Sequence, residues 1–133
     1  MWGNFQQSNL RIEVDASEKV IKDSLLESDR LKQWMWPQNF ASLSGKLRLG
    51  DTFTSSLGLV KIEHEVEFLD DNSLRLLLSK GIDGFHEWHW GDGWLQSRLE
   101  GISLLPLNFG QTLSLLRLRQ YLNSIDTPQA KNT

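Results

Sequence analysis

The run VKIEHEVEF, residues 60–68, decides the kind of fold that this chain can form. Apolar or weakly polar side chains alternate with charged ones, which is the period of two of a β-strand with one buried and one wet face. The buried face is expected to carry Val60, Ile62, His64, Val66 and Phe68. A sheet with one apolar face needs a second layer to cover that face.

Further short runs on both sides of this strand predict an antiparallel meander between residues 42 and 105. LSGKLRLGD, residues 43–51, predicts a strand that turns at its last two residues into the next strand. The cluster DDNS at 70–73 and the dipeptide Asp92-Gly93 are typical of tight turns between strands.

Helical patterns flank the meander. Residues 9–15 predict a first strand, after which Asp15 and Glu18 have the spacing of a capping box at the start of a short helix. A second short helix, capped by Ser28 or Asp29, should end before Pro37. After Pro106, leucines at helical spacing predict a long amphipathic helix over about 108–124, and residues 125–133 are expected to form a flexible tail.

The composition fits one globular domain spanning 1–133, with its core at 9–124. Of the 133 residues, 39% are hydrophobic and 23% are charged, and there is no cysteine, which excludes disulfides and thiolate chemistry. The net charge of −3 with scattered basic residues makes nucleic acid an unexpected partner. No apolar run of membrane-spanning length and no signal-peptide pattern is present, so we expect a cytoplasmic protein without an integral membrane segment.

The stretch GFHEWHWGDGW, residues 84–94, concentrates the residues that could carry function. As a strand, it places His86, Trp88 and Trp90 on one face and Phe85, Glu87 and His89 on the other. The tryptophan face is the expected wall of a ligand pocket, although the same side chains could be core alone. If a one-residue slip turned the other face inward, a buried Glu-His pair would replace the aromatic wall.

Metal binding and general-base catalysis are two further chemistries that histidines of this chain could carry. HEWH resembles the zinc motif H-E-x-x-H but is one residue short, and its histidines face opposite sides of a strand, so no metal site and no cofactor is expected. His64 is the one polar member of its strand face. It is either a core histidine with a hydrogen-bond partner or, as the one catalytic candidate, a general base.

The order of strand, two short helices, about six to seven antiparallel strands and one long helix resembles the helix-grip, or START-like, superfamily. That superfamily includes polyketide cyclase and dehydrase-like proteins and the Bet v 1 type. The resemblance covers residues 9–124 and rests on IEVDASEKV, the Trp34–Pro37 break, GKLRLGDTF, the DDNS turn and the terminal leucine stripe. It implies an α+β fold in which a curved sheet wraps around the C-terminal helix, with a cavity between them.

Three functions are compatible with these expectations. The favoured one is non-enzymatic binding of a small hydrophobic or amphipathic ligand. Its expected contacts are His64, His86, Trp88, Trp90, Phe68, Leu115 and Leu118. The second is a cyclase or dehydratase-like enzyme with His64 as base and Glu87 or His89 as its partner. The third is a protein-interaction module with a filled core and an exposed patch around Trp2, Trp36 or Phe40. The sequence leaves the ligand's identity and the oligomeric state open.

Overall fold

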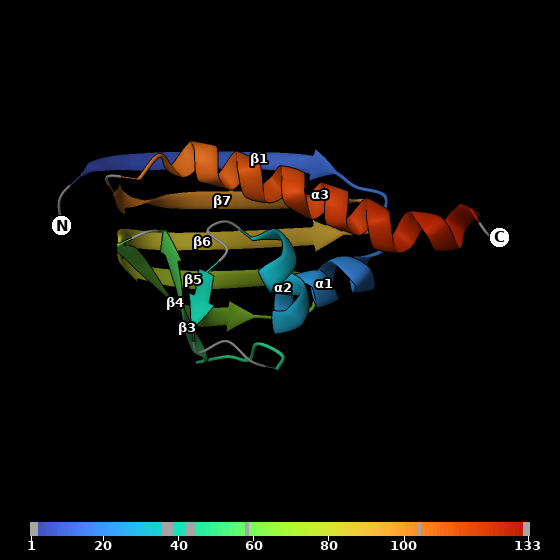
Figure 1. The fold of residues 1–133 in the computed structure, drawn as a ribbon, viewed down its shortest axis with the longest axis horizontal. Helices are drawn as coiled ribbons and strands as arrows, with labels where there is room; N and C mark the ends of the chain where they lie inside the picture. Colours follow the sequence, from blue (N-terminus) through green and yellow to red (C-terminus); the bar gives the residue numbers. More distant parts are fainter. Residues whose placement is uncertain (1–2, 36–38, 42–44, 58, 104, 132–133) are drawn as a thin grey trace.

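The described residues form one seven-stranded antiparallel sheet that is covered by helices (Figure 1). The computed structural model describes residues 3–35, 39–41, 45–57, 59–103 and 105–131, and their side chains except at 39–41, 57 and 126–131. Along the sheet the strand order is β1-β7-β6-β5-β4-β3-β2. The strands are β1 (Asn4–Glu13), β2 (Asn39–Ala41), β3 (Thr52–Leu57), β4 (Val60–Leu69), β5 (Ser73–Lys80), β6 (Ile82–Gly91) and β7 (Trp94–Ser103).

Three helices lie on one side of this sheet (Figure 1). They are α1 (Glu18–Leu26), α2 (Ser28–Trp34) and the long α3 (Leu107–Lys131). Helix α3 runs along the sheet beside β1 and β7, while α1 and α2 cover its other half. The predicted α+β helix-grip arrangement is therefore confirmed, and α3 continues beyond residue 124, where the leucine stripe predicted its end.

The strand predicted over 43–51 is wrong in its described part, residues 45–51. This segment is irregular, with one bridge between Lys46 and Glu27 and a turn at Leu49 and Gly50, and Leu49 is 67% exposed. The Asp51 carboxylate accepts a hydrogen bond from the Arg48 backbone N–H at 2.8 Å, which closes a turn around Gly50 at φ 88°. The alternating residues in 45–51 therefore do not form a strand, and β3 pairs with β4 on one side and with the short β2 on the other.

The starts of the first two helices also differ from the prediction. Ser17, rather than Asp15, caps α1, because its hydroxyl accepts the Val20 backbone N–H at 3.2 Å. Ser28 is the first residue of α2 and not its cap. Helix α2 ends at Trp34, and Pro37 lies outside the described residues.

Strand β4 keeps its predicted alternation only over its middle. Ile62, His64 and Val66 are buried, but a register shift between Val66 and Phe68 interrupts the pairing with β5. A bulge of this kind changes the face to which the following side chain points. Phe68 is consequently 49% exposed, and its predicted place on the buried face is wrong.

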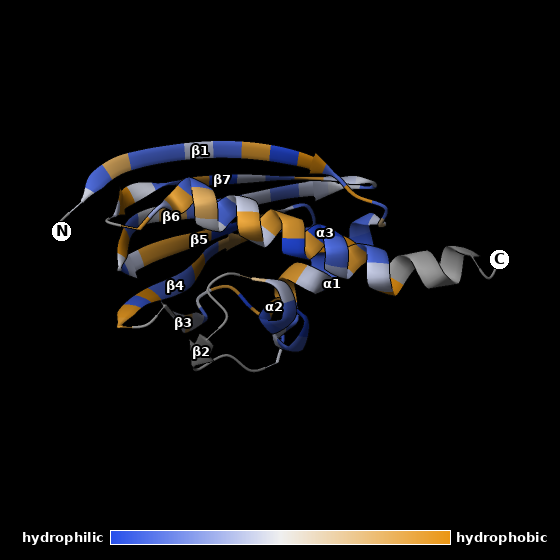
Figure 2. Cartoon of the chain, turned by 45° about the horizontal axis from the view of Figure 1, so that its top comes forward, coloured by the Kyte–Doolittle hydropathy of each residue, from blue (hydrophilic) through white to orange (hydrophobic). Residues whose placement is uncertain are grey.

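The core divides along the length of the sheet. Buried apolar residues of the core come from both the strands and the helices, and Figure 2 shows hydrophobic residues in both layers. Under α1 and α2, Trp34 packs edge-on against Trp88 with ring centroids 5.6 Å apart, and Trp90 and Leu95 fill the space beside them. Under the first turns of α3 the buried residues are smaller or polar, and there the packing leaves a hollow.

Candidate functional site

A small pocket lies between the first turns of α3 and the concave face of the sheet. Its volume is about 40 Å³, which is room for about three water molecules. The wall combines apolar side chains with four polar ones. It is formed by Met35, Ile62, His64, Leu78, Ile82, His86, Leu99, Leu107, Gly110, Gln111 and Ser114.

His64 is held in the pocket wall by its neighbours on β3. Its Nε2 lies 2.9 Å from Ser55 Oγ, and its ring stacks on Phe53 with centroids 4.4 Å apart and planes 5° from parallel. The two contacts fix both the position and the rotation of the imidazole. Its other nitrogen, Nδ1, is buried and has no hydrogen-bond partner in the described part of the chain.

His86 belongs to a second polar group that joins β6, β7 and α3. Its Nε2 lies 2.7 Å from Ser97 Oγ, and the Gln111 amide nitrogen donates to Ser97 Oγ at 3.0 Å and to the Ser97 carbonyl at 2.9 Å. Because that carbonyl can only accept, the Gln111 side chain is fixed with its nitrogen toward β7. Gln111 Oε1 then remains buried without a partner among the described residues.

Both histidines are uncharged near neutral pH. Burial lowers the pKa of His64 to about 3. Burial lowers the pKa of His86 to about 3 as well, with a smaller contribution from the nearby His64. Their side chains are 5% and 8% exposed, so the loss of hydration on charging accounts for both shifts. The pocket therefore offers neutral hydrogen-bonding groups rather than a positive charge.

Comparison with known proteins identifies the fold. No family model matches the sequence, and no curated protein is similar to it. Among solved structures, the Aha1 dimer from Colwellia psychrerythraea superposes with a TM-score of 0.65 at 17% identity, covering 88% of this chain and 96% of that chain. The AHSA1-like protein from Aeromonas hydrophila gives a TM-score of 0.67 at 10% identity, with coverage of 90% and 94%.

A third neighbour is DynU16, a putative protein in the dynemicin biosynthetic locus, with a TM-score of 0.67 at 16% identity. The match covers 88% of this chain and 47% of DynU16, so the chain spans about half of that protein. These neighbours share one architecture. The chain has the helix-grip fold. At such low identity the likeness shows the fold alone.

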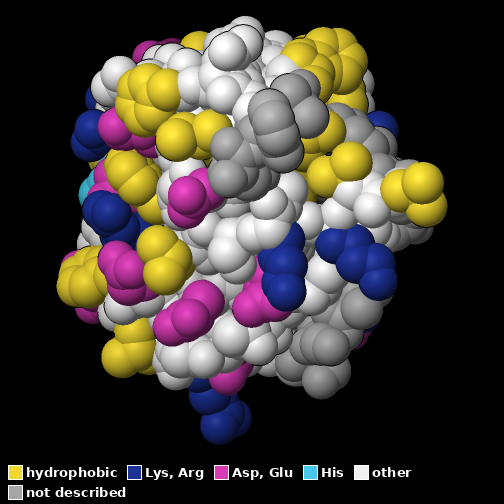
Figure 3. Space-filling model, turned by 90° about the vertical axis from the view of Figure 1, so that its left-hand side faces the viewer, with side chains coloured by type: hydrophobic (Ala, Val, Ile, Leu, Met, Phe, Trp, Pro, Cys, Tyr) yellow, Lys and Arg dark blue, Asp and Glu magenta, His cyan; other side chains and the backbone are white. Residues whose placement is uncertain are grey.

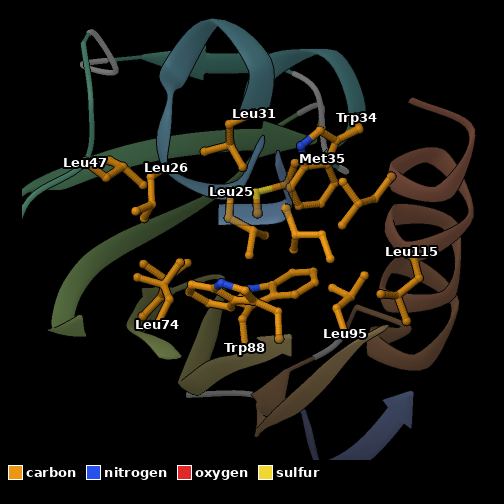
Figure 4. Packing of buried hydrophobic residues seen from close by; sticks show 14 of the residues in the cluster. Leu25, Leu26, Leu31, Trp34, Met35, Leu47, Leu74, Trp88, Leu95 and Leu115 are labelled. Atoms are coloured by element: carbon orange, nitrogen blue, oxygen red, sulfur yellow. The ribbon is translucent and has the colours of Figure 1, made fainter. Parts of the chain in front are cut away.

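The helix-grip fold brings only some of the predicted ligand contacts into the pocket. His64 and His86 line it. Trp88 and Trp90, at 0% and 1% exposure, are packed in the core and do not line the pocket, and the same holds for Leu115 and Leu118. In Figure 4, Trp88 lies at the centre of the packed cluster, below Trp34 and Met35 and beside Leu95. Of the two alternatives for Trp88 and Trp90, a pocket wall or core alone, their position agrees with core alone.

The opposite face of β6 is the outer face of the helix-grip sheet. Glu87 bonds to Arg75 at 2.9 Å and lies 3.8 Å from Arg98, while His89 is exposed and lies 3.0 Å from Ser73 Oγ. The alternative in which Glu87 and His89 face inward is therefore wrong. Phe68 lines a groove on this outer face, away from the pocket. Neither Glu87 nor His89 can serve as a partner of His64, whose partner is Ser55.

Sequence reasoning missed Gln111, Ser55 and Ser97 as members of the site. Gln111 lies four and seven residues before Leu115 and Leu118, so helical spacing already placed it on their buried face. A polar glutamine on this apolar helix face was the feature of the sequence that could have identified Gln111 as a site residue. For Ser55 and Ser97 the signal was weaker, because serine is common on half-buried strands and parity gives only the face.

Within the described ranges, no three histidine or carboxylate side chains are close enough to hold a metal ion. Among the described helices, none combines the length and the apolar composition that a bilayer crossing requires.

Proposed function

We propose that this chain binds a small amphipathic molecule in the pocket between the sheet and α3. One observation carries the proposal: two buried polar atoms, His64 Nδ1 and Gln111 Oε1, belong to side chains of the pocket wall and lack partners within the described residues. Burying such an atom unpaired costs about 1–3 kcal/mol, so a ligand that satisfied either atom would recover part of this cost.

The size of the pocket restricts this ligand to a slender molecule. A volume of about 40 Å³ is well below the roughly 150 Å³ cavity that takes up benzene in another protein, so a ligand of benzene's size or larger enters only if a wall residue moves. Met35, unbranched and 4% exposed, is the wall residue best suited to rotate and enlarge the space. The start of α3 is less able to move, because the Gln6 side chain bonds to the Ser103 and Leu105 carbonyls and to the Leu107 N–H.

Binding is favoured over catalysis by the same geometry. An imidazole with a pKa of about 3 is a weak general base near neutral pH. Ser55, its hydrogen-bond partner, is completely buried and does not line the pocket, so it cannot reach a substrate there. The cyclase-like alternative is therefore not proposed.

The small volume favours a second candidate, an interaction module with an almost filled core. Hydrophobic side chains lie between charged ones on the end of the molecule shown in Figure 3. This end carries the β3–β4 turn with the fully exposed Leu59 and the start of α3 with Phe109, which is 60% exposed. The earlier expectation of a patch at Trp2, Trp36 and Phe40 falls on side chains outside the described residues.

Titration with hexanamide, a slender chain with one amide group, tests the first candidate. We expect it to shift the backbone NMR signals of Leu78, Gly110 and Gln111 in the ¹⁵N-labelled protein. Gly110→Ala adds a methyl group to the pocket wall, so it should weaken binding several-fold while raising helix stability by about 1 kcal/mol. Thr112→Ala, at an exposed position one residue beyond Gln111, is the matched control and should leave binding unchanged. Absence of any shift in the wild-type protein would favour the interaction module.

A further inference from the structure

We infer that the pocket selects uncharged ligands that carry both a hydrogen-bond donor and an acceptor, such as an amide or a hydroxyl, and rejects carboxylates. This inference rests on the proposed function, because it names the class of ligand for the same pocket. Three features of the described wall carry it: its lack of charged side chains, the unpaired His64 Nδ1 and the unpaired Gln111 Oε1.

Among the described residues, no charged side chain lines the pocket. Its polar members within the described residues are His64, His86, Gln111 and Ser114. The charged groups of these strands lie on the opposite face of the sheet, where Glu87 pairs with Arg75. A carboxylate in the pocket would be desolvated without a cation beside it, and an unpaired buried charge is far more costly than a buried amide.

The free donor is on His64. The Ser55 hydroxyl has His64 Nε2 as its partner in the described part of the chain. If the hydroxyl donates to Nε2, the ring proton lies on Nδ1, and a single donor is left unpaired. If Nε2 donates instead, the serine hydroxyl loses its acceptor and Nδ1 is unpaired as well. The first tautomer leaves fewer unsatisfied groups, so Nδ1 is an N–H donor that seeks an acceptor.

The free acceptor is on Gln111. Its amide nitrogen is engaged by the Ser97 carbonyl and hydroxyl, which leaves Oε1 as an unpaired carbonyl oxygen. A carboxylate offers acceptors only and cannot satisfy this oxygen. An amide or a hydroxyl carries both the acceptor that Nδ1 lacks and the donor that Oε1 lacks. The wall therefore disfavours a carboxylate by its charge and by its hydrogen-bonding pattern.

The test compares hexanamide with hexanoate, which have nearly the same shape and differ in charge. At neutral pH we expect hexanamide to bind at least about thirtyfold more tightly in an NMR titration that follows Gly110 and the histidine ring nitrogens. Equal binding of both compounds at these residues would overturn the selectivity and leave the binding function standing. Binding of neither compound would overturn both proposals and leave water as the occupant of the pocket.

A pair of double variants tests the role of His64. Ser55→Ala with His64→Phe removes a buried serine-histidine pair while keeping a planar ring against Phe53, and should weaken hexanamide binding about tenfold. Ser73→Ala with His89→Phe makes the same exchange at the exposed pair on the outer face and should leave binding unchanged. Removing both partners together avoids an orphaned polar group, so the first variant should fold. Full hexanamide affinity in the first variant, or an equal loss in both, would contradict the assignment.

Discussion

At the scale of the residue, the two buried histidines matter through their neutrality. His64 and His86 lie on neighbouring parts of the pocket wall, and each is held by a serine on an adjacent strand. No charged side chain of the described wall faces them, and His64 itself lowers the pKa of His86. Charging either imidazole would place a cation in an apolar interior, so the fold is stable only while both are neutral.

This arrangement predicts that stability falls in acid. In the folded protein both pKa values are about 3, whereas a histidine in the unfolded chain titrates near 6.5. Between these values the unfolded chain binds more protons, so the free energy of unfolding decreases as the pH falls. Below about pH 6 the two histidines together should contribute a slope of about 2.7 kcal/mol per pH unit.

Urea unfolding between about pH 7 and pH 4.5 measures this slope. The variant Ser55→Ala with His64→Phe should lose about half of the histidine contribution. Ser73→Ala with His89→Phe is the control, since His89 is exposed in the folded protein. A slope that stays the same in the first variant would show that His64 is protonated alike in the folded and unfolded chain.

At the scale of the element, β6 and β7 approach each other closely where two glycines are paired. Gly84 lies opposite Gly101 in the register. A Cβ at Gly84 would be 1.9 Å from the Glu100 carbonyl oxygen and 2.5 Å from the Gly101 Cα, both of which belong to the backbone. Only glycine therefore permits this pairing, which brings Ile82 and His86 into the pocket wall.

Gly84→Ala should consequently lower the free energy of unfolding by at least about 1–3 kcal/mol, because the backbone of one strand must shift. Asp83→Ala, at the exposed neighbouring position, is the control and should change stability by less than about 0.5 kcal/mol. Thermal unfolding followed by circular dichroism compares the two variants. Wild-type stability in Gly84→Ala would mean that the strands are further apart in solution than described here.

At the scale of the whole molecule, the core has a packed half and a hollow half. Trp88 connects the packed half, because it contacts Trp34, whose indole N–H donates to the Ser24 carbonyl of α1 at 2.9 Å. The hollow half lies under α3, where Gly110 and Ser114 present little volume to the sheet. On the buried face of β6, Trp88 therefore stabilises the core while His86 lines the pocket.

Separate variants should distinguish these two halves. Trp88→Phe should lower the free energy of unfolding by less than the about 3–5 kcal/mol typical of truncation to alanine. Its effect on hexanamide binding should be below about twofold, since Trp88 is outside the pocket wall. A Trp88→Phe protein that kept its stability but no longer bound hexanamide would place the tryptophan in the binding site.

The sequence by itself determined the order of the helices and of the strands other than β2, and the face of most strand residues. Alternation in β4 and β6 identified Ile62, His64, His86 and Trp88 as buried, because side chains of a strand must alternate between its two faces. The alternation gave the wrong face for Phe68, because a bulge interrupts the strand there. It also predicted a strand at residues 45–51, which contain a turn instead.

Only the tertiary structure decided where the buried face is hollow. Parity gave His86 and Trp88 the same face, yet the first lines the pocket and the second fills the core. The difference depends on what α1, α2 and α3 place opposite each strand position, and these contacts join residues far apart in the chain, such as Gln111 with Ser97 and Trp34 with Trp88. A cavity is the volume that remains after such segments pack, so no local pattern in the sequence can specify it.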